Sequence, residues 1–133
     1  MTRQEFSQML AIASENAIVK INDCLPHIFK LSKHKIDVLL TGSESFNMTD
    51  CFHFIQACDF TMEFEWEYCT ELSDLRAAIK KTRQDYKMSR RDLSIKSGVH
   101  TNVISAFEDG SCTLKIDSLL RIADALNATI TIE

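Results

Sequence analysis

The chain has 133 residues and a formal net charge of −4, and its 45% hydrophobic and 26% charged residues are typical of a globular protein and argue against disorder. No apolar run approaches the roughly 18 to 20 residues that a membrane-spanning helix needs, and the opening MTRQEFSQML carries an acid and amides too early for a signal peptide. We therefore expect a cytoplasmic protein without membrane contact, with room for one domain or two very small ones.

The cysteines and histidines do not form a pattern typical of a disulfide framework or a metal site. The five cysteines are odd in number and include no CxxC pair, and only Cys51 and His53 are spaced as a loose ligand pair. Reduced cysteine usually packs as a small hydrophobic side chain. We therefore expect free thiols, no metal and no cofactor.

An internal repeat with an offset of 68 residues organises the chain, since residues 31–65 align without a gap with residues 99–133. Gly42 corresponds to Gly110, and almost every apolar position has an apolar counterpart. The apolar pairs are Ile36/Ile104, Leu39/Phe107, Phe46/Leu114, Met48/Ile116, Phe52/Leu120 and Phe54/Ile122. We therefore predict two copies of one unit, residues 1–68 and 69–133, each with four helices and a strand.

A strand is predicted at the end of each copy, because TMEFEWEY at 61–68 and ATITIE at 128–133 alternate with a period of two. Two lone strands make a marginal sheet in water, so we expect them to pair, within the chain or across two chains. The buried face of this sheet is expected to be lined by Met62, Phe64, Trp66, Ile130 and Ile132. The outer, solubilising face carries Glu63, Glu65 and Glu67. The alternative is that each strand merely caps its own helical bundle.

The second copy begins with two predicted helices. An amphipathic helix of about four turns is indicated by apolar residues at helical spacing, namely Leu72, Leu75, Ile79 and Tyr86. In the following SRRD, Ser89 is a helix cap with Asp92 three residues later, which forms a capping box. The helix that it opens is predicted to end near Ser97 and Gly98.

A short helix is then predicted in GVHTNVISAFEDG, residues 98–110, with Gly98 in the turn before it and Gly110 as its stop. Val99, Ile104 and Phe107 form the side of this segment that suits a core, while the other side is polar. A last helix is predicted to begin near Thr113 and to stop at Asn127, a residue that tolerates the left-handed conformation.

The second copy resembles the Cro/cI family of repressors, also called the XRE family, over roughly residues 71–126. The resemblance lies in MSRRDLSIKSGV for the second helix and turn, VISAFEDG for the third helix and its exit, and SLLRIADALN for the final helix. It implies a mainly α fold of tandem lambda-repressor-like helix-turn-helix bundles, each followed by one short β-strand.

Members of this family insert the third helix into the major groove, so the resemblance implies which residues contact DNA. The positions that face base edges are Thr101, Asn102, Ser105 and Ala106. The positions that contact phosphates are Arg90, Arg91, Ser111, Thr113 and Lys115. Arg83 and Glu108 match a structural ion pair that ties the first helix to the end of the third.

The sequence departs from the family pattern at two positions of the third helix. His100 stands where Ser or Thr usually caps the helix, so we expect Thr101 to cap it instead and to shorten it by one residue. Ala106 stands where Arg or Gln often lies, which predicts modest base readout supplemented by readout of DNA shape.

The two copies differ in charge. Residues 1–68 contain five Lys and Arg against ten Asp and Glu, whereas residues 69–133 contain ten against nine. Most of the basic residues of the second copy lie beside the turn that would contact phosphates, which favours nucleic-acid binding. With the offset of 68, Glu15 replaces Arg83, Leu40 replaces Glu108, and Asn22, Asp23 and Pro26 replace Arg90, Arg91 and Ser94. Lys33, His34 and Lys35 leave DNA contact by the first copy open.

We therefore predict a sequence-specific transcriptional regulator, a repressor, that binds double-stranded DNA as a homodimer. The dimer would form through residues 1–68 or through paired C-terminal strands, since Cro and HipB-type antitoxins, which this chain resembles in its final strand, dimerise through strands. One alternative is an antitoxin that holds a toxin through residues 1–68 and represses its own operon; another is a protein-binding scaffold without DNA binding. An enzyme is not expected, because there is no Gly-rich phosphate loop and no nucleophile with a plausible base.

Overall fold

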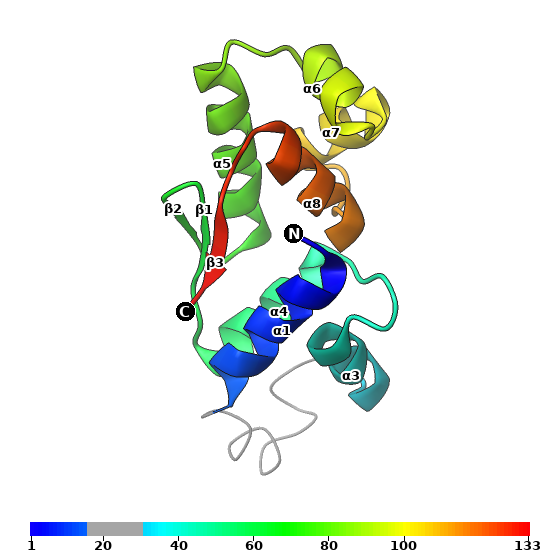
Figure 1. Ribbon diagram of the computed structural model, residues 1–133, viewed down its shortest axis with the longest axis vertical. Coiled ribbons are helices and arrows are strands. Elements are labelled where there is room, and N and C mark those ends of the chain that lie inside the picture. The colour runs from blue at the N-terminus through cyan, green and yellow to red at the C-terminus, as the bar shows by residue number, and fades with distance from the viewer. Residues whose placement is uncertain (16–30) are drawn as a thin grey trace.

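The computed structural model describes residues 1–15 and 31–133, and in these residues the fold is mainly α with one small antiparallel sheet, as the sequence predicts (Figure 1). The elements of the first half are α1 (Arg3–Ser14), α3 (Lys33–Thr41), α4 (Met48–Cys58), β1 (Met62–Phe64) and β2 (Glu67–Cys69). Those of the second half are α5 (Leu72–Asp85), α6 (Arg90–Ser97), α7 (Thr101–Glu108), α8 (Ile116–Ala125) and β3 (Ile130–Ile132).

Four elements of the first half, α1, α3, α4 and β1, have a counterpart of the same type in the second half at nearly constant spacing. Helices α3 and α7 begin 68 residues apart, as do α4 and α8, and strands β1 and β3 differ by 68 at both ends. The first helices instead differ by 69, because the Thr2–Glu5 capping box of α1 corresponds to the Glu71–Asp74 box of α5. Ser14 therefore corresponds to Arg83, which corrects the expected pairing of Arg83 with Glu15. The expected counterparts Asn22, Asp23 and Pro26 lie outside the described residues.

The strands of the two halves pair with each other within the chain. The sheet has the order β2-β1-β3, and β1 runs antiparallel to β3 with Met62 opposite Ile132, Glu63 opposite Thr131 and Phe64 opposite Ile130. Glu63 and Thr131 are themselves 68 residues apart, so within this pairing each strand contacts the equivalent residues of the other. This reciprocity is the pattern of a two-fold interface between equivalent units.

A second reciprocal contact lies between the segments that precede α4 and α8. The amide of Met48 donates to the carbonyl of Leu114 at 2.7 Å, and the amide of Ile116 donates to the carbonyl of Phe46 at 2.9 Å. Asn47 and Lys115 form the bridge between them. Because residues up to Lys115 are extended for this pairing, α8 begins at Ile116, which corrects the start near Thr113 expected from local sequence.

The segment 61–68 is a hairpin rather than the single strand that its alternation predicts. Glu65 and Trp66 have φ values of 46° and 72°, so the chain reverses between β1 and β2. Positive φ at both central residues is the requirement of the type I′ two-residue turn. Trp66 is consequently 83% exposed, and its expected place on the buried face of the sheet is wrong.

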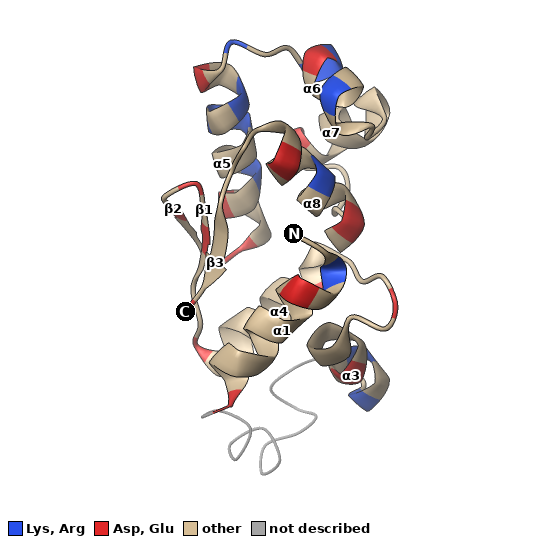
Figure 2. Ribbon diagram, in the orientation of Figure 1, with Lys and Arg blue, Asp and Glu red and all other residues tan. Residues whose placement is uncertain are grey.

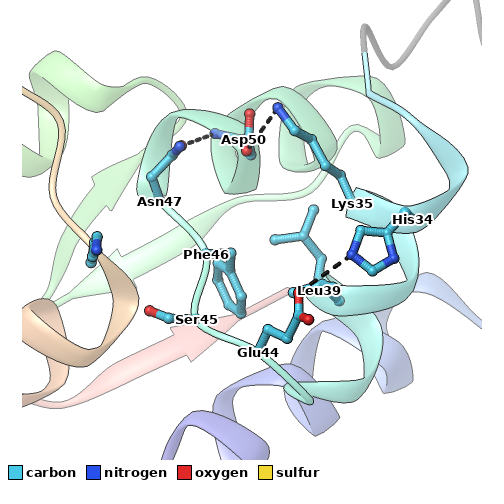
Figure 3. A pocket seen from close by; sticks show the side chains of 10 residues that line it. His34, Lys35, Leu39, Glu44, Ser45, Phe46, Asn47 and Asp50 are labelled. Atoms are coloured by element: carbon cyan, nitrogen blue, oxygen red, sulfur yellow. Dashed lines mark hydrogen bonds and ion pairs between the residues drawn. The ribbon is translucent and has the colours of Figure 1, made fainter.

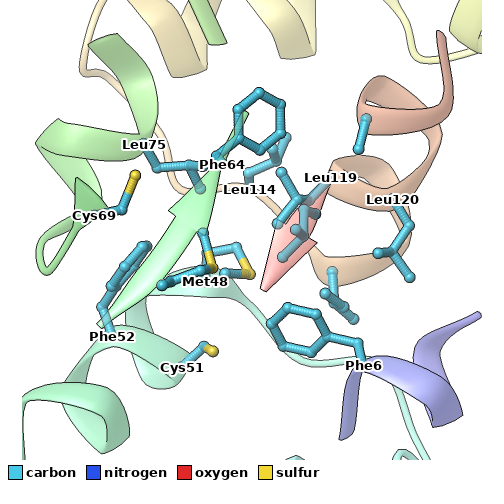
Figure 4. Close-up of a cluster of buried hydrophobic side chains, with 14 of the residues drawn as sticks. Phe6, Met48, Cys51, Phe52, Phe64, Cys69, Leu75, Leu114, Leu119 and Leu120 are labelled. Carbon is cyan, nitrogen blue, oxygen red and sulfur yellow. The ribbon is translucent and has the colours of Figure 1, made fainter. Parts of the chain in front are cut away.

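One core is shared by both halves. Figure 4 shows Phe6 of α1 and Met48 of α4 beside Phe64 of β1 and Leu119 of α8, and all four are fully buried.

Cys51, Cys58 and Cys69 are free thiols, and burial raises the pKa of Cys58 to about 11 and of Cys69 to about 12. Tyr86, expected among the apolar positions of α5, is 54% exposed because α5 ends at Asp85.

Candidate nucleic-acid interface

Helices α6 and α7 form a helix-turn-helix whose bounds follow from local capping. Ser89 accepts from the amide of Asp92, whose side chain in turn accepts from the amide of Ser89, so the predicted capping box opens α6. Gly98, with a φ of 77°, ends α6 in the left-handed conformation that glycine adopts without strain. His100 caps α7, because its Nδ1 accepts from the amide of Asn102 at 3.0 Å. The helix therefore starts at Thr101, and the expectation that Thr101 caps it is wrong.

The outer face of α7 is small and mostly uncharged. Ile104 and Phe107 are each 1% exposed and fix the inner face of the helix. With about 100° between successive residues, the opposite direction falls between Ser105 and Asn102, close to Asn102. Asn102 is exposed, and the other residues predicted to face base edges, Thr101, Ser105 and Ala106, are partly exposed.

Val103 also belongs to this face, although sequence reasoning did not select it. Its side chain is 40% exposed, at the edge of the face beside Asn102. The helical spacing of Val99, Ile104 and Phe107 places Val103 outside the buried face, so the sequence could have indicated that Val103 is exposed. An exposed valine adds an apolar contact surface to α7.

A buried ion pair holds α7 in place. Arg83 Nη2 lies 2.7 Å from Glu108 Oε1, and Arg83 Nε donates to Glu108 Oε2 at 2.9 Å. The Arg83 and Glu108 side chains are 9% and 0% exposed, and Arg83 Nη1 also donates to the carbonyl of Met88 at 2.8 Å. The bidentate pair thus joins α5 to the end of α7 and to the segment before α6.

Arg90, predicted to contact phosphate, is held by carboxylates at the end of α7. Its Nη2 lies 2.8 Å from Asp109 Oδ1, and its Nε lies 3.4 Å from Glu108 Oε1. The hydrogen bond from Arg90 lowers the pKa of Asp109, and the same bond raises the pKa of Arg90. Arg91 is exposed, and within the described residues it makes no hydrogen bond or ion pair. Of the two arginines, Arg91 therefore has the freer guanidinium.

The other residues predicted to contact phosphates lie in the loop after α7, and they differ in how accessible they are. Ser111 and Lys115 are exposed, whereas Thr113 faces the first half. Thr113 Oγ1 accepts from the amide of Thr49 at 3.2 Å and lies 2.7 Å from Thr49 Oγ1. The structure therefore leaves Ser111 and Lys115 open to a ligand and ties Thr113 to the start of α4.

Basic side chains flank α7 without lying on it. Figure 2 shows Lys and Arg on α5 and α6, while α7 carries no Lys or Arg.

Within residues 1–15 and 31–133, no cluster of His, Cys, Asp and Glu is arranged to hold a metal ion. Among those same residues, no helix has both the length and the apolar character to cross a bilayer.

Comparison with known proteins identifies this part of the chain. A family model described as the Cro/C1-type HTH DNA-binding domain matches residues 78–131, from within α5 through α6, α7 and α8 to β3. Searches of curated proteins and of solved structures found no match. The match includes the helix pair, the capping box and the exposed face of α7 described above. Residues 78–131 are therefore similar to the Cro/C1-type helix-turn-helix DNA-binding domain.

Proposed function

We propose that the protein is a transcriptional regulator that represses by placing α7 in the major groove of double-stranded DNA. The observation that carries this proposal is the exposed polar face of α7, on a helix whose orientation is fixed by the buried Arg83–Glu108 pair. A helix that is held rigidly and exposes short polar side chains suits contact with base edges. The Cro/C1-type match over residues 78–131 supports DNA binding in general.

Asn102 is the main candidate for base readout. Its side chain lies near the centre of the exposed face, and an asparagine can bond with N6 and N7 of adenine together. Thr101 and Ser105 add hydroxyl groups, while Val103 and Ala106 offer apolar contact to a thymine methyl group. With one amide and no arginine on α7, specificity is expected to be modest.

Phosphate contact falls mainly to the start of α6 and the loop after α7. The N-terminus of α6 presents backbone amides to an anion, and Arg91 is free to lie beside it. Arg90 can reach a phosphate only by sharing or leaving Asp109. Ser111 and Lys115 approach the backbone from the other end of α7.

The test is salt-dependent binding to random duplex and to duplex selected from a random library by the wild-type protein. Asn102→Ala is expected to cost about 1 to 3 kcal/mol on the selected duplex alone. Arg91→Ala is expected to weaken both duplexes and to reduce the salt slope by about 1. Lys81→Ala is the matched control, because Lys81 pairs with Glu67 beside β2, away from α7. Absence of any duplex binding by the wild type at low salt would contradict the proposal.

A second candidate is an antitoxin that holds a protein partner through the first half. The observation that favours it is the hairpin of β1 and β2, where Trp66 and Tyr68 are 83% and 70% exposed. Exposed aromatic side chains of this size are typical of protein interfaces. Co-purification of a co-expressed toxin with the wild type, and not with Trp66→Ser, would distinguish this role from repression alone.

A further inference from the structure

We propose that α3 of the first half is a second DNA-contacting helix, so that one chain places two unequal helices on successive major grooves of one duplex. This inference rests on the proposed function, because α3 acquires the role only if α7 contacts DNA. It goes beyond that function by assigning DNA contact to the acidic first half and by making a homodimer unnecessary.

The first step is the relation between the halves. The β1–β3 pairing and the bridge between Asn47 and Lys115 each join residues that are equivalent at an offset of 68. Two reciprocal contacts at separate places define an approximate two-fold relation between the halves. Under such a relation, α3 has the same position in the first half as α7 has in the second half. Figure 1 accordingly shows α3 and α7 on the same side of the molecule, toward its two ends.

The second step is the geometry that DNA requires. Proteins of the helix-turn-helix class read two half-sites about one helical turn, or roughly 34 Å, apart, with two helices in fixed relation. In a homodimer the fixed relation comes from a subunit interface. Here the strands that would form such an interface, β1 and β3, already pair within the chain. In a single chain, the relative position of α3 and α7 is therefore fixed in the same way as that of the two recognition helices in a dimer.

The third step is the chemistry of the exposed face of α3. Ser32 caps the helix by accepting from the amide of Lys35, and Ile36, Val38 and Leu39 are buried against the core. The first turn exposes Lys33, His34 and Lys35, at the positions that Thr101, Asn102 and Val103 occupy in α7. Helix α3 therefore presents two lysines where α7 presents neutral side chains, and its contacts suit phosphates more than base edges.

The three basic side chains are not equally available. His34 Nε2 lies 3.3 Å from Glu44 Oε2, and Lys35 Nζ lies 3.5 Å from Asp50 Oδ2, as Figure 3 shows beside a pocket at this face. Lys33 is exposed and has no hydrogen-bond or ion-pair partner among the described residues. Lys33 is thus the side chain best placed to contact a phosphate, and its removal breaks no hydrogen bond or ion pair among the described residues.

The first half has a net negative charge, but the acidic residues of its β-hairpin lie away from the proposed DNA-contacting face. Glu63, Glu65 and Glu67 belong to β1, β2 and the turn between them, which lie on the opposite side of the molecule from α3 (Figure 2). Glu63 and Glu65 also accept hydrogen bonds from Thr131 and Thr129 of the second half. Three of the ten Asp and Glu residues of this half therefore face away from the side that carries α3 and α7, whereas Asp37 lies on α3, and Glu44 and Asp50 pair with His34 and Lys35.

The test uses the full chain with duplex selected from a random library by the wild type. One chain is expected to bind each duplex, measured by analytical ultracentrifugation. Phosphate-ethylation interference is expected to mark two backbone segments about one helical turn apart. Lys33→Ala is expected to weaken binding several-fold, to lower the salt slope by about 1, and to abolish interference at one segment only. Lys81→Ala, an equal loss of charge on the opposite side, is expected to change none of these.

Two results would overturn the inference. One is a complex of two chains per duplex; the other is a Lys33→Ala variant that matches Lys81→Ala in affinity, salt slope and interference pattern. If Asn102→Ala still loses affinity for the selected duplex in that case, DNA reading by α7 stands and contact by α3 fails. If the wild type binds no duplex, both fail together.

Discussion

Removal of one partner from the Arg83–Glu108 pair is expected to destabilise the protein strongly. The Glu108 side chain has 0% exposure and that of Arg83 has 9%, so either charge left alone stays out of water. In Glu108→Leu, Arg83 would keep only the carbonyl of Met88 as a partner. Breaking a buried ion pair from one side costs about 3 to 5 kcal/mol, because the remaining charge loses its counter-ion without regaining hydration. We expect a loss of this size for Glu108→Leu and a smaller loss for Arg83→Met, because Arg90 Nε still lies 3.4 Å from Glu108 Oε1 in that variant.

The double variant separates the cost of an orphaned charge from the value of the pair. The first half carries Ser14 and the partly buried Leu40 at the equivalent positions, so the same backbone accepts residues without charge there. Replacing both partners of a buried pair by apolar residues is often neutral or stabilising. Arg83→Met combined with Glu108→Leu is therefore expected to be more stable than either single variant.

The assay is urea denaturation of the four proteins at neutral pH, with the free energy of unfolding obtained by linear extrapolation and combined in a double-mutant cycle. Lys81→Ala, which breaks the exposed pair with Glu67, is expected to change the free energy of unfolding little. Single variants that each lose less than about 1 kcal/mol, the value of an exposed pair, would refute the reasoning. A double variant as unstable as the two losses added together would refute it too.

Three further predictions concern turns and the end of α7. Gly42→Ala is expected to lower the melting temperature more than Gly110→Ala. Both glycines have positive φ, but a Cβ at Gly42 would lie 3.1 Å from the Cα of Gln4, and one at Gly110 would meet nothing within 4 Å. Trp66→Gly is expected to raise the free energy of unfolding by about 1 kcal/mol in urea denaturation, because it relieves a left-handed φ of 72° at a side chain that is 83% exposed. Asp109→Asn is expected to tighten binding to random duplex in a mobility-shift titration, because it loosens Arg90. Since Arg90 lowers the folded-state pKa of Asp109, the stability that this carboxylate contributes is present above its unfolded pKa and lost as the pH falls through the folded one. The stability difference between wild type and Asp109→Asn should therefore narrow on acidification.

Elements that depend on neighbouring residues were predictable from the sequence. The Ser89–Asp92 capping box and the stop at Gly98 follow from side-chain and backbone preferences over a few positions, and the structure has both. The inner face of α7 likewise follows from the spacing of Ile104 and Phe107. In each case the chemistry that fixes the element lies within one or two helical turns.

Features that depend on distant residues were not predictable in the same way. Alternation over 61–68 is the same for one long strand and for a hairpin, and the turn at Glu65 and Trp66 lacks the usual Asn-Gly signal. The start of α8 depends on pairing of residues 114–116 with residues 46–48. At the candidate site, Arg90 pairs with Asp109, and Thr113 is hydrogen-bonded to Thr49. Matching Arg90 and Thr113 to positions of a family does not reveal these partners.

The proposed arrangement of two related units in one chain would remove a constraint that applies to every homodimer. In a homodimer each substitution appears on both sides of the two-fold axis, whereas here Lys33 and Thr101 occupy equivalent positions with different chemistry. The contacts that keep the relation between the halves are backbone hydrogen bonds, at β1–β3 and at residues 46–48 with 114–116, which tolerate changes of side chain. The halves can therefore diverge in charge while their helices stay in register. On this reasoning an asymmetric DNA site, read on one side through Asn102 and held on the other through Lys33, is the natural target of a single chain.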